Sequence, residues 1–270
     1  MRIIDLQGHI VPDDDARLYR FFGYSVTSPN DIRTALKKAA KEPVTVRINS
    51  YGGDVWSASD MYTLLRQHEP GVNVEITGLA ASAATVVMMA GNAVRASPTA
   101  EIMIHNPMMS ADGDYRAMEQ AARSLQNTRE TIVNAYELKT GLSRERLREM
   151  MDSETWMTAQ SAKIDGFLDE ILFAEDGKMS DEPAESAQGA SAGAKNAALA
   201  LPSADELRAR WSVWNEIAPG AANIDDARRM LMEHNASAEE DRLENETDEP
   251  EMNEHSDVEL LRRRIQTLAT

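Results

Sequence analysis

One serine and one histidine each lie at the end of a predicted apolar element, and together they are the residue types of a catalytic pair. Ser82 lies between an alternating apolar segment that ends at Ile76 and a wholly apolar segment from Ala83 to Ala90, and His105 ends another apolar segment, EIMIH. A serine hydroxyl attacks a carbonyl carbon when a histidine removes its proton, and backbone N–H groups then stabilise the oxyanion. These residue types indicate acyl transfer as the candidate chemistry.

Each of these features also has an ordinary structural explanation. Serine is a preferred N-cap of helices, and the local sequence of Ser82 by itself fits a cap better than a nucleophile. A hydrogen-bonded core or strand-end histidine is likewise the better explanation of His105 taken alone. Gly52-Gly53 follows a predicted strand, where it is either a plain turn or a place where backbone N–H groups approach a ligand. Three such features at successive strand ends are harder to ascribe to coincidence than one.

The other histidines are weaker candidates for a general base. They lie near the first predicted strand, at a polar helix end, and in the acidic carboxyl-terminal region, and they are His9, His68, His234 and His255. His105 is therefore the candidate base.

The elements predicted around these residues form an α/β fold with a mainly parallel sheet and flanking helices. Periodicity predicts strands at 2–10, 44–49, 72–76, 101–105 and 168–173, a short element at 93–96, and helices at 29–42, 55–67, 83–90, 115–140, 143–151 and 158–165. The segment from 11 to 29 is polar and turn-rich. Because the carboxyl ends of parallel strands meet at one edge of a sheet, Ser82, His105 and Gly53 are expected to lie together.

Composition excludes several other classes of protein. The chain of 270 residues has no cysteine, so a disulfide framework, a thiolate metal site and a thiol nucleophile are excluded, which fits a cytoplasmic protein. A net charge of −17 argues against binding to nucleic acid or to an anionic membrane surface. No segment has the length and apolarity of a membrane span.

The composition changes near Glu175, and most of the negative charge lies beyond it. Residues 1–175 are expected to form one globular domain and residues 176–200, rich in small and polar residues, a flexible linker. Residues 201–270 are expected to form an acidic, largely disordered tail with short helical segments at 204–217 and 224–234, suited to a scaffold or to partner binding. We expect the tail to be dispensable for the fold.

Four segments in a fixed order make the chain similar to a known family. INSYGGDV, GLAASAATVVMMAGN, MIHNPM and ETWMTAQSAKIDGFLDEIL resemble the Clp protease proteolytic subunits, serine peptidases of crotonase-like fold, and the similarity covers about residues 3–173. The resemblance implies that Ser82 is the nucleophile, His105 the general base, and the backbone N–H groups of Gly53 and Ala83 the oxyanion hole. It implies no metal and no other cofactor. Tyr51 replaces the proline that usually precedes the glycine pair.

The acidic member of the triad is where the chain departs from the family. The position that usually holds aspartate is occupied by Glu154, which can orient a histidine as aspartate does. Asp152, two residues earlier, would project to the same side if the segment were extended. Glu154 is the preferred acid and Asp152 the alternative.

The divergent amino terminus, Glu154 and the acidic tail resemble the phage head-maturation branch of the family. That resemblance implies capsid or scaffold proteins as substrates, possible cleavage of the chain itself, and a location in the host cytoplasm or the prohead interior. The apolar residues of the helix at 115–140, namely Met118, Ala121, Ala122, Leu125, Ile132, Val133 and Tyr136, are expected to help form a homo-oligomer, as a ring.

Three alternative functions stay open. The first is a housekeeping-type Clp subunit that works with an ATPase partner, and the second is a non-catalytic assembly or scaffold protein with a degenerate protease domain. The third, a crotonase-type enzyme acting on acyl-CoA, needs no serine–histidine pair, so the presence of both Ser82 and His105 speaks against it.

Overall fold

The computed structural model describes residues 2–174, 187–188 and 201–233. The chain divides into two compact units: Met1–Arg17 with Ser25–Leu201, and Leu18–Tyr24 with Pro202–Thr270. The first unit contains the sheet and every predicted site residue.

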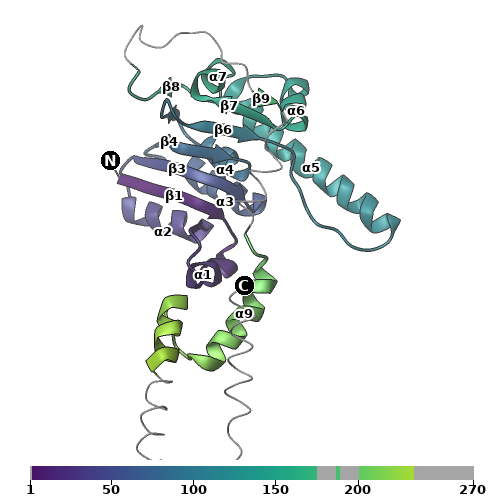
Figure 1. The fold of residues 1–270 in the computed structure, drawn as a ribbon. Helices are drawn as coiled ribbons and strands as arrows, with labels where there is room; N and C mark the ends of the chain where they lie inside the picture. The colour runs from purple at the N-terminus through teal and green to yellow at the C-terminus, as the bar shows by residue number, and fades with distance from the viewer. Residues whose placement is uncertain (1, 175–186, 189–200, 234–270) are drawn as a thin grey trace, which may run out of the picture. The chain divides into compact units, whose positions relative to one another are not determined.

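The described strands of the first unit form one mainly parallel sheet, as predicted (Figure 1). Its order is β2-β1-β3-β4-β6-β7-β9, with β5 pairing with β4 and with β8. Only the pairings of β7 with β6 and with β9 are antiparallel among these strands. The strands are β1 (Arg2–Ile10), β2 (Val26–Thr27), β3 (Val44–Gly53), β4 (Val72–Ala81), β5 (Ala93–Ala96), β6 (Glu101–Ile104), β7 (Thr155–Thr158), β8 (Glu170–Ile171) and β9 (Ala187–Gln188).

Helices connect the strands and cover the sheet. Those of the first unit are α2 (Pro29–Ala39), α3 (Val55–Arg66), α4 (Ala83–Met88), α5 (Tyr115–Thr140), α6 (Arg144–Asp152) and α7 (Ala159–Ile164), and α1 (Asp13–Phe21) begins in this unit. The central strands alternate: Val46, Ile48, Val74 and Ile76 are fully buried, while Arg47 is exposed and forms an ion pair with Glu75 of the neighbouring strand. All six residues of α4 are buried, as the apolar segment predicted.

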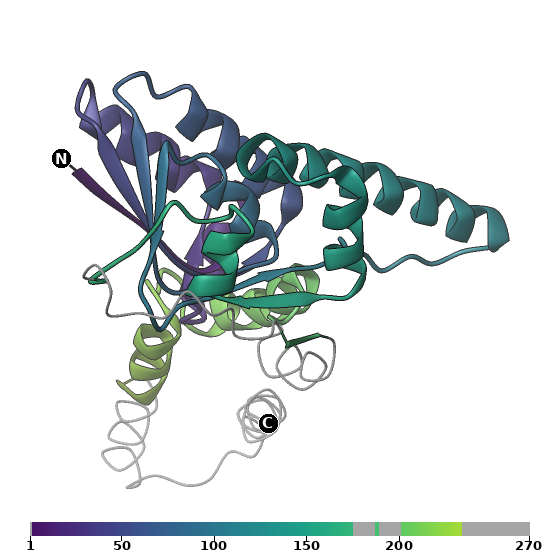
Figure 2. The ribbon, with the colours of Figure 1, turned by 90° about the horizontal axis from the view of Figure 1, so that it is seen from above.

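Helix α5 has two different halves. Its carboxyl-terminal half packs on the core, with Ile132, Val133 and Tyr136 buried. Its amino-terminal half extends away from the sheet, as Figures 1 and 2 show. The expectation that Ile132, Val133 and Tyr136 belong to a subunit surface is therefore wrong, because the chain's own core buries them.

The amino-terminal region is more regular than the sequence suggested. The segment expected to be turn-rich contains α1 and β2. Three acidic residues, Asp13, Asp14 and Asp15, form the first turn of α1, where negative charge is favoured by the helix dipole. β8 is shorter than the strand expected at 168–173, and β9 lies inside the expected linker, whose other residues are outside those described.

The second unit joins two distant parts of the sequence. It contains the end of α1, α9 (Ala204–Ile217) and a helix at residues 224–233. Both tail helices were predicted, the second up to the last described residue. The division of the sequence at 175 did not anticipate that Leu18–Tyr24 would belong with them.

Candidate active site

Ser82 joins β4 to α4 in a strained conformation. Its backbone has φ 54° and ψ −126°, in a region that residues with a side chain rarely adopt. It occupies the N-cap position of α4, but its side chain makes no capping hydrogen bond. Unfavourable backbone angles of this kind persist where the surrounding structure holds them, and they are frequent at active sites.

The hydroxyl of Ser82 is paired with His105 instead. Nε2 of His105 lies 2.7 Å from Oγ of Ser82. The sheet sets this distance, because β4 and β6 pair in parallel with Ala81 beside Met103, and the N–H of Ser82 donates to the carbonyl of Met103 at 2.9 Å. The residues that follow the two strands, Ser82 and His105, therefore emerge side by side as predicted.

Two hydrogen bonds in series connect the backbone of Ser82 to helix α5. The hydroxyl of Thr85 donates to the carbonyl of Ser82 and lies 2.6 Å from the hydroxyl of Tyr136 on α5. Burial raises the pKa of Tyr136, so its hydroxyl stays protonated. Sequence reasoning missed both residues, since only the spatial contact between α4 and α5 reveals this chain.

The glycine pair at the end of β3 lies against the same turn. Gly52 has φ 88°, and a Cβ there would come within 2.6 Å of the carbonyl of Ala81 and 2.8 Å of the backbone nitrogen of Ala83. Gly53 has φ 142°, and its Cβ would come within 2.1 Å of the carbonyl of Ile10. Glycine is needed at both positions, and the backbone of β3 approaches the start of α4 closely.

Ser50 fixes this loop, a role that the sequence did not suggest. Its buried hydroxyl donates to the carbonyl of Gly8 at 2.7 Å and accepts from the N–H of Gly52 at 3.1 Å. The register between β3 and β4 shifts between Ile48 and Ser50, while Gly52 and Gly53 stay paired with β1 on the other side of the strand. Ala83 is the first residue of α4, so its N–H has no partner within the helix.

Glu154 lies close enough to His105 to affect the pKa of its imidazole. Burial lowers the pKa of His105, and the carboxylate of Glu154 raises it in part. Glu154 has φ 47° in the turn that ends α6, and its Oε1 is buried without a hydrogen-bond partner among the described residues. A strained residue with an unpaired buried carboxylate oxygen beside the histidine has the character of a functional group.

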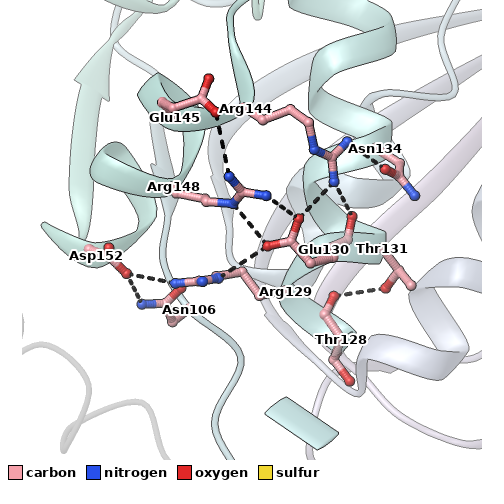
Figure 3. Close-up of polar contacts among 10 residues, drawn as sticks. All are labelled: Asn106, Thr128, Arg129, Glu130, Thr131, Asn134, Arg144, Glu145, Arg148 and Asp152. Carbon is pink, nitrogen blue, oxygen red and sulfur yellow. Dashed lines mark hydrogen bonds and ion pairs between the residues drawn. The ribbon is translucent and has the colours of Figure 1, made fainter. Parts of the chain in front are cut away.

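Asp152 is engaged elsewhere (Figure 3). It is the last residue of α6 rather than part of an extended segment, so the geometry assumed for it in the sequence was wrong. Its Oδ1 accepts from Nδ2 of Asn106 at 2.7 Å and from Arg129 at 3.2 Å. Asp152 thus ties the residue after His105 to α5.

An ion cluster between α5 and α6 lies next to this contact (Figure 3). Glu130 accepts hydrogen bonds from Arg148 at 2.7 and 2.9 Å and from Arg144 at 2.8 Å. These hydrogen bonds, first from Arg148 and then from Arg144, lower the pKa of Glu130 to about 2. The cluster joins the helix before the Glu154 turn to α5.

Among the described residues, no group of three or more histidine or acidic side chains is arranged to hold a metal ion. Within the same residues, no helix combines the length and the apolarity that a membrane crossing requires.

Comparison with known proteins gives consistent results. Residues 31–175 match the family model described as Clp protease. The chain is 36% identical over 136 residues to the ATP-dependent Clp protease proteolytic subunit 1 of Chlamydia abortus (strain DSM 27085 / S26/3), covering 49% of this chain and 71% of that protein. A solved structure, the ClpP1 N165D mutant from Listeria monocytogenes, aligns with TM-score 0.53 and 24% identity over 65% of this chain and 94% of that one. That alignment confirms the predicted ClpP-like fold.

Proposed function

The chain belongs to the Clp protease family of serine peptidases, and we propose that it is an endopeptidase with Ser82 as nucleophile, His105 as general base and Glu154 as the acid that orients the histidine. The observation that carries this proposal is the distance of 2.7 Å between Nε2 of His105 and Oγ of Ser82. A serine that only capped α4 would direct its hydroxyl to a backbone N–H, and Ser82 does not.

The proposed reaction follows the acyl-enzyme route. His105 removes the proton of Ser82 as Oγ attacks the carbonyl carbon of a peptide bond, and the N–H groups of Gly53 and Ala83 stabilise the oxyanion. The imidazolium then gives its proton to the leaving amine, and the peptide C–N bond breaks. Water, activated by the same histidine, hydrolyses the ester and regenerates Ser82. The carboxylate of Glu154 stabilises the imidazolium.

The lowered pKa of His105 suits this role. Because burial lowers its pKa, the imidazole is mainly neutral near pH 7 and is able to accept a proton. The opposing effect of Glu154 means that the positive charge formed during the reaction is partly compensated. Both properties support His105 as a base rather than as a structural histidine.

Hydrolysis of quenched fluorescent peptides tests this function. We expect the Ser82→Ala variant to lose hydrolysis while it keeps its melting temperature, since the change removes one hydroxyl from a turn held by backbone contacts. Ser59→Ala, which changes an exposed serine on α3, is the matched control and should retain full activity. Equal hydrolysis by the Ser82→Ala and parent proteins would refute the assignment.

The finer proposal is a phage head-maturation protease that cleaves capsid or scaffold proteins, including its own linker. The acidic region at 201–270, the small-residue composition of 176–200 and the glutamate at position 154 support it. Full-length Ser82→Ala protein mixed with a trace of active protein should be cut within 176–200, as measured by intact mass. An uncut Ser82→Ala chain under conditions in which peptides are hydrolysed would argue against self-processing.

A housekeeping-type subunit with an ATPase partner is the second candidate. The observation that favours it is the 36% identity to a protein named as an ATP-dependent Clp protease subunit. Cleavage of a folded capsid precursor without nucleotide would favour the head-maturation function. Cleavage only with an ATPase of the Clp type and ATP would favour the second.

We also propose that copies of this chain assemble into a ring-shaped homo-oligomer. The amino-terminal half of α5 leaves large apolar side chains exposed, including Tyr115 at 66% and Met118 at 41%. Exposed apolar side chains that cluster on a projecting helix are a common feature of subunit interfaces.

A further inference from the structure

The end of α1 carries aromatic residues that the peptidase site does not use. Tyr19, Phe21, Phe22 and Tyr24 follow one another within a few residues, and Tyr19 and Phe21 are buried. This segment belongs to the same compact unit as the chain from Pro202 onward. The second unit is thus built from a short amino-terminal segment and the tail, which the whole peptidase sequence separates.

Helix α9 presents one apolar stripe in this unit. Leu207, Trp211, Trp214 and Ala218 recur at intervals of three and four residues, so they lie on one side of the helix. The ring of Phe21 meets the ring of Trp211 edge to face, with centroids 4.3 Å apart. The buried core of the unit consists of Phe21, Trp214, Ala218 and Ala227, packed against Phe22, Trp211, Ala221, Ile224, Met230 and Leu231.

A hydrogen bond also joins the amino-terminal segment to the start of the tail. The hydroxyl of Tyr19 donates to the carbonyl of Pro202 at 3.0 Å, at the point where the tail enters the unit. The ring of Tyr19 also meets that of Tyr24 edge to face, with centroids 6.1 Å apart. The amino-terminal segment therefore contacts both the start of the tail and the face of α9.

Three ion pairs of the tail lie within its own helices. The ion pairs Arg208–Asp205, Arg210–Glu206 and Arg228–Asp225 are each local to one helix and largely exposed. Exposed pairs at such spacing stabilise a helix weakly and do not join separate segments. The aromatic core, in contrast, contains side chains from both segments of the unit.

We propose that this unit is a noncovalent anchor, which keeps residues 202–233 bound to Leu18–Tyr24 after the chain has been cut anywhere between 175 and 200. None of the described contacts within this unit involves a residue of that linker, whose strand β9 pairs with β7 of the first unit. The intact linker keeps the tail at a high local concentration, and a cut removes this effect. The cut leaves the contacts of the aromatic core unchanged. A single cut in the linker then does not release the tail, and release requires a second event that opens the aromatic core.

The anchor can be tested without any peptidase activity of the chain. A recognition sequence for a site-specific protease is inserted between Ala192 and Gly193 of the full-length Ser82→Ala protein, which is then cut and passed over a size-exclusion column under native conditions. We expect both fragments to co-elute at micromolar concentration, as detected by mass spectrometry. Because an added protease makes the cut, the result does not depend on the proposed function.

Variants in each segment identify the contact. Replacing Phe21 and Phe22 together by alanine should make the cut tail elute separately, and so should Trp211→Ala in the tail. Phe173→Ala is the matched control, because Phe173 is 86% exposed and its loss should leave the fragments together. Circular dichroism of each uncut variant checks that the peptidase unit is folded.

Hydrogen exchange gives an independent readout. The peptide Leu18–Tyr24 should be equally protected before and after the cut in the Ser82→Ala protein, and less protected in the Trp211→Ala variant. Separation of the cut fragments without any substitution would overturn the anchor. Full retention of the tail by the Phe21→Ala, Phe22→Ala variant would overturn it as well.

Discussion

At the scale of single residues, two opposing influences set the charge of His105. Burial lowers its pKa and Glu154 raises it, and burial has the larger effect. A histidine that acts as general base works in its neutral form, which exists above its pKa. Activity is therefore lost as the pH falls through the pKa of His105.

The first prediction is the position of this acid limb. Because the pKa of His105 is below the ordinary value of 6.5, half of the maximal kcat/KM should be lost at a pH below 6.5. The pH dependence of peptide hydrolysis measures this midpoint. A midpoint above 6.5 would mean that another group limits the reaction or that the histidine is not buried in the active protein.

The second prediction separates the two candidate acids. Glu154→Gln removes the influence that raises the pKa of His105, so the acid limb should move to still lower pH. It should also slow hydrolysis by up to about 10⁴-fold, the loss found when a triad aspartate becomes an amide.

Asp152→Asn is the matched control for this change. Asp152 contacts Asn106 and Arg129, so its amide should leave the acid limb in place and slow hydrolysis much less. The opposite order of the two variants would make Asp152 the acid of the triad.

Sequence reasoning reached some of these residues and not others. Ser82 and His105 follow strands with clear apolar patterns, and parallel pairing brings such strand ends together. The contacts of Asp152 depend on where α6 ends, which local sequence does not determine. Thr85 and Tyr136 meet across 51 positions of sequence, so no local pattern connects them.

At the scale of elements, the site depends on the close approach of β3 to the start of α4. The third prediction is that Gly52→Ala abolishes activity, because a Cβ there would come within 2.8 Å of the nitrogen of Ala83 and of the Cβ of Ser82. The backbone atoms must then move apart, and the candidate oxyanion donors move with them. Peptide hydrolysis and reactivity of Ser82 measure the loss.

Gly71→Ala is the control for backbone strain. Gly71 also has a positive φ, of 99°, but its Cβ would meet only the side chain of Asn92 at 3.4 Å, an ordinary contact. This variant should lose some stability and keep its activity. If both variants lost activity equally, strain in glycine turns rather than the contact with α4 would explain the effect.

The core elements were predictable because their apolar periods are regular, while the amino-terminal elements were not. Strands β3 and β4 continue beyond the predicted ends, to Gly53 and Ala81, since pairing with neighbours extends them into residues of low strand propensity. Helix α1 was missed because its sequence is polar, and its buried Tyr19 and Phe21 are covered by the second unit to which they belong.

At the scale of the whole molecule, the exposed half of α5 and the second unit are the features that a single peptidase unit does not explain. The fourth prediction is self-association through α5. Sedimentation at micromolar concentration should give a closed homo-oligomer, and replacing Tyr115 and Met118 with serine should shift it toward smaller species. Replacing Leu138, which is exposed near the other end of α5, with serine is the control. A fully active monomer would contradict this prediction.

The proposed function depends on Ser82 being an activated nucleophile, and reaction with a fluorophosphonate measures that activation. The probe labels a serine only when a base activates its hydroxyl, and peptide mass mapping identifies the labelled residue. We expect one stoichiometric label at Ser82 in the parent protein, a large loss of labelling in His105→Ala, and none in Ser82→Ala. Absence of label from the folded parent protein, or equal labelling of the His105→Ala variant, would contradict it.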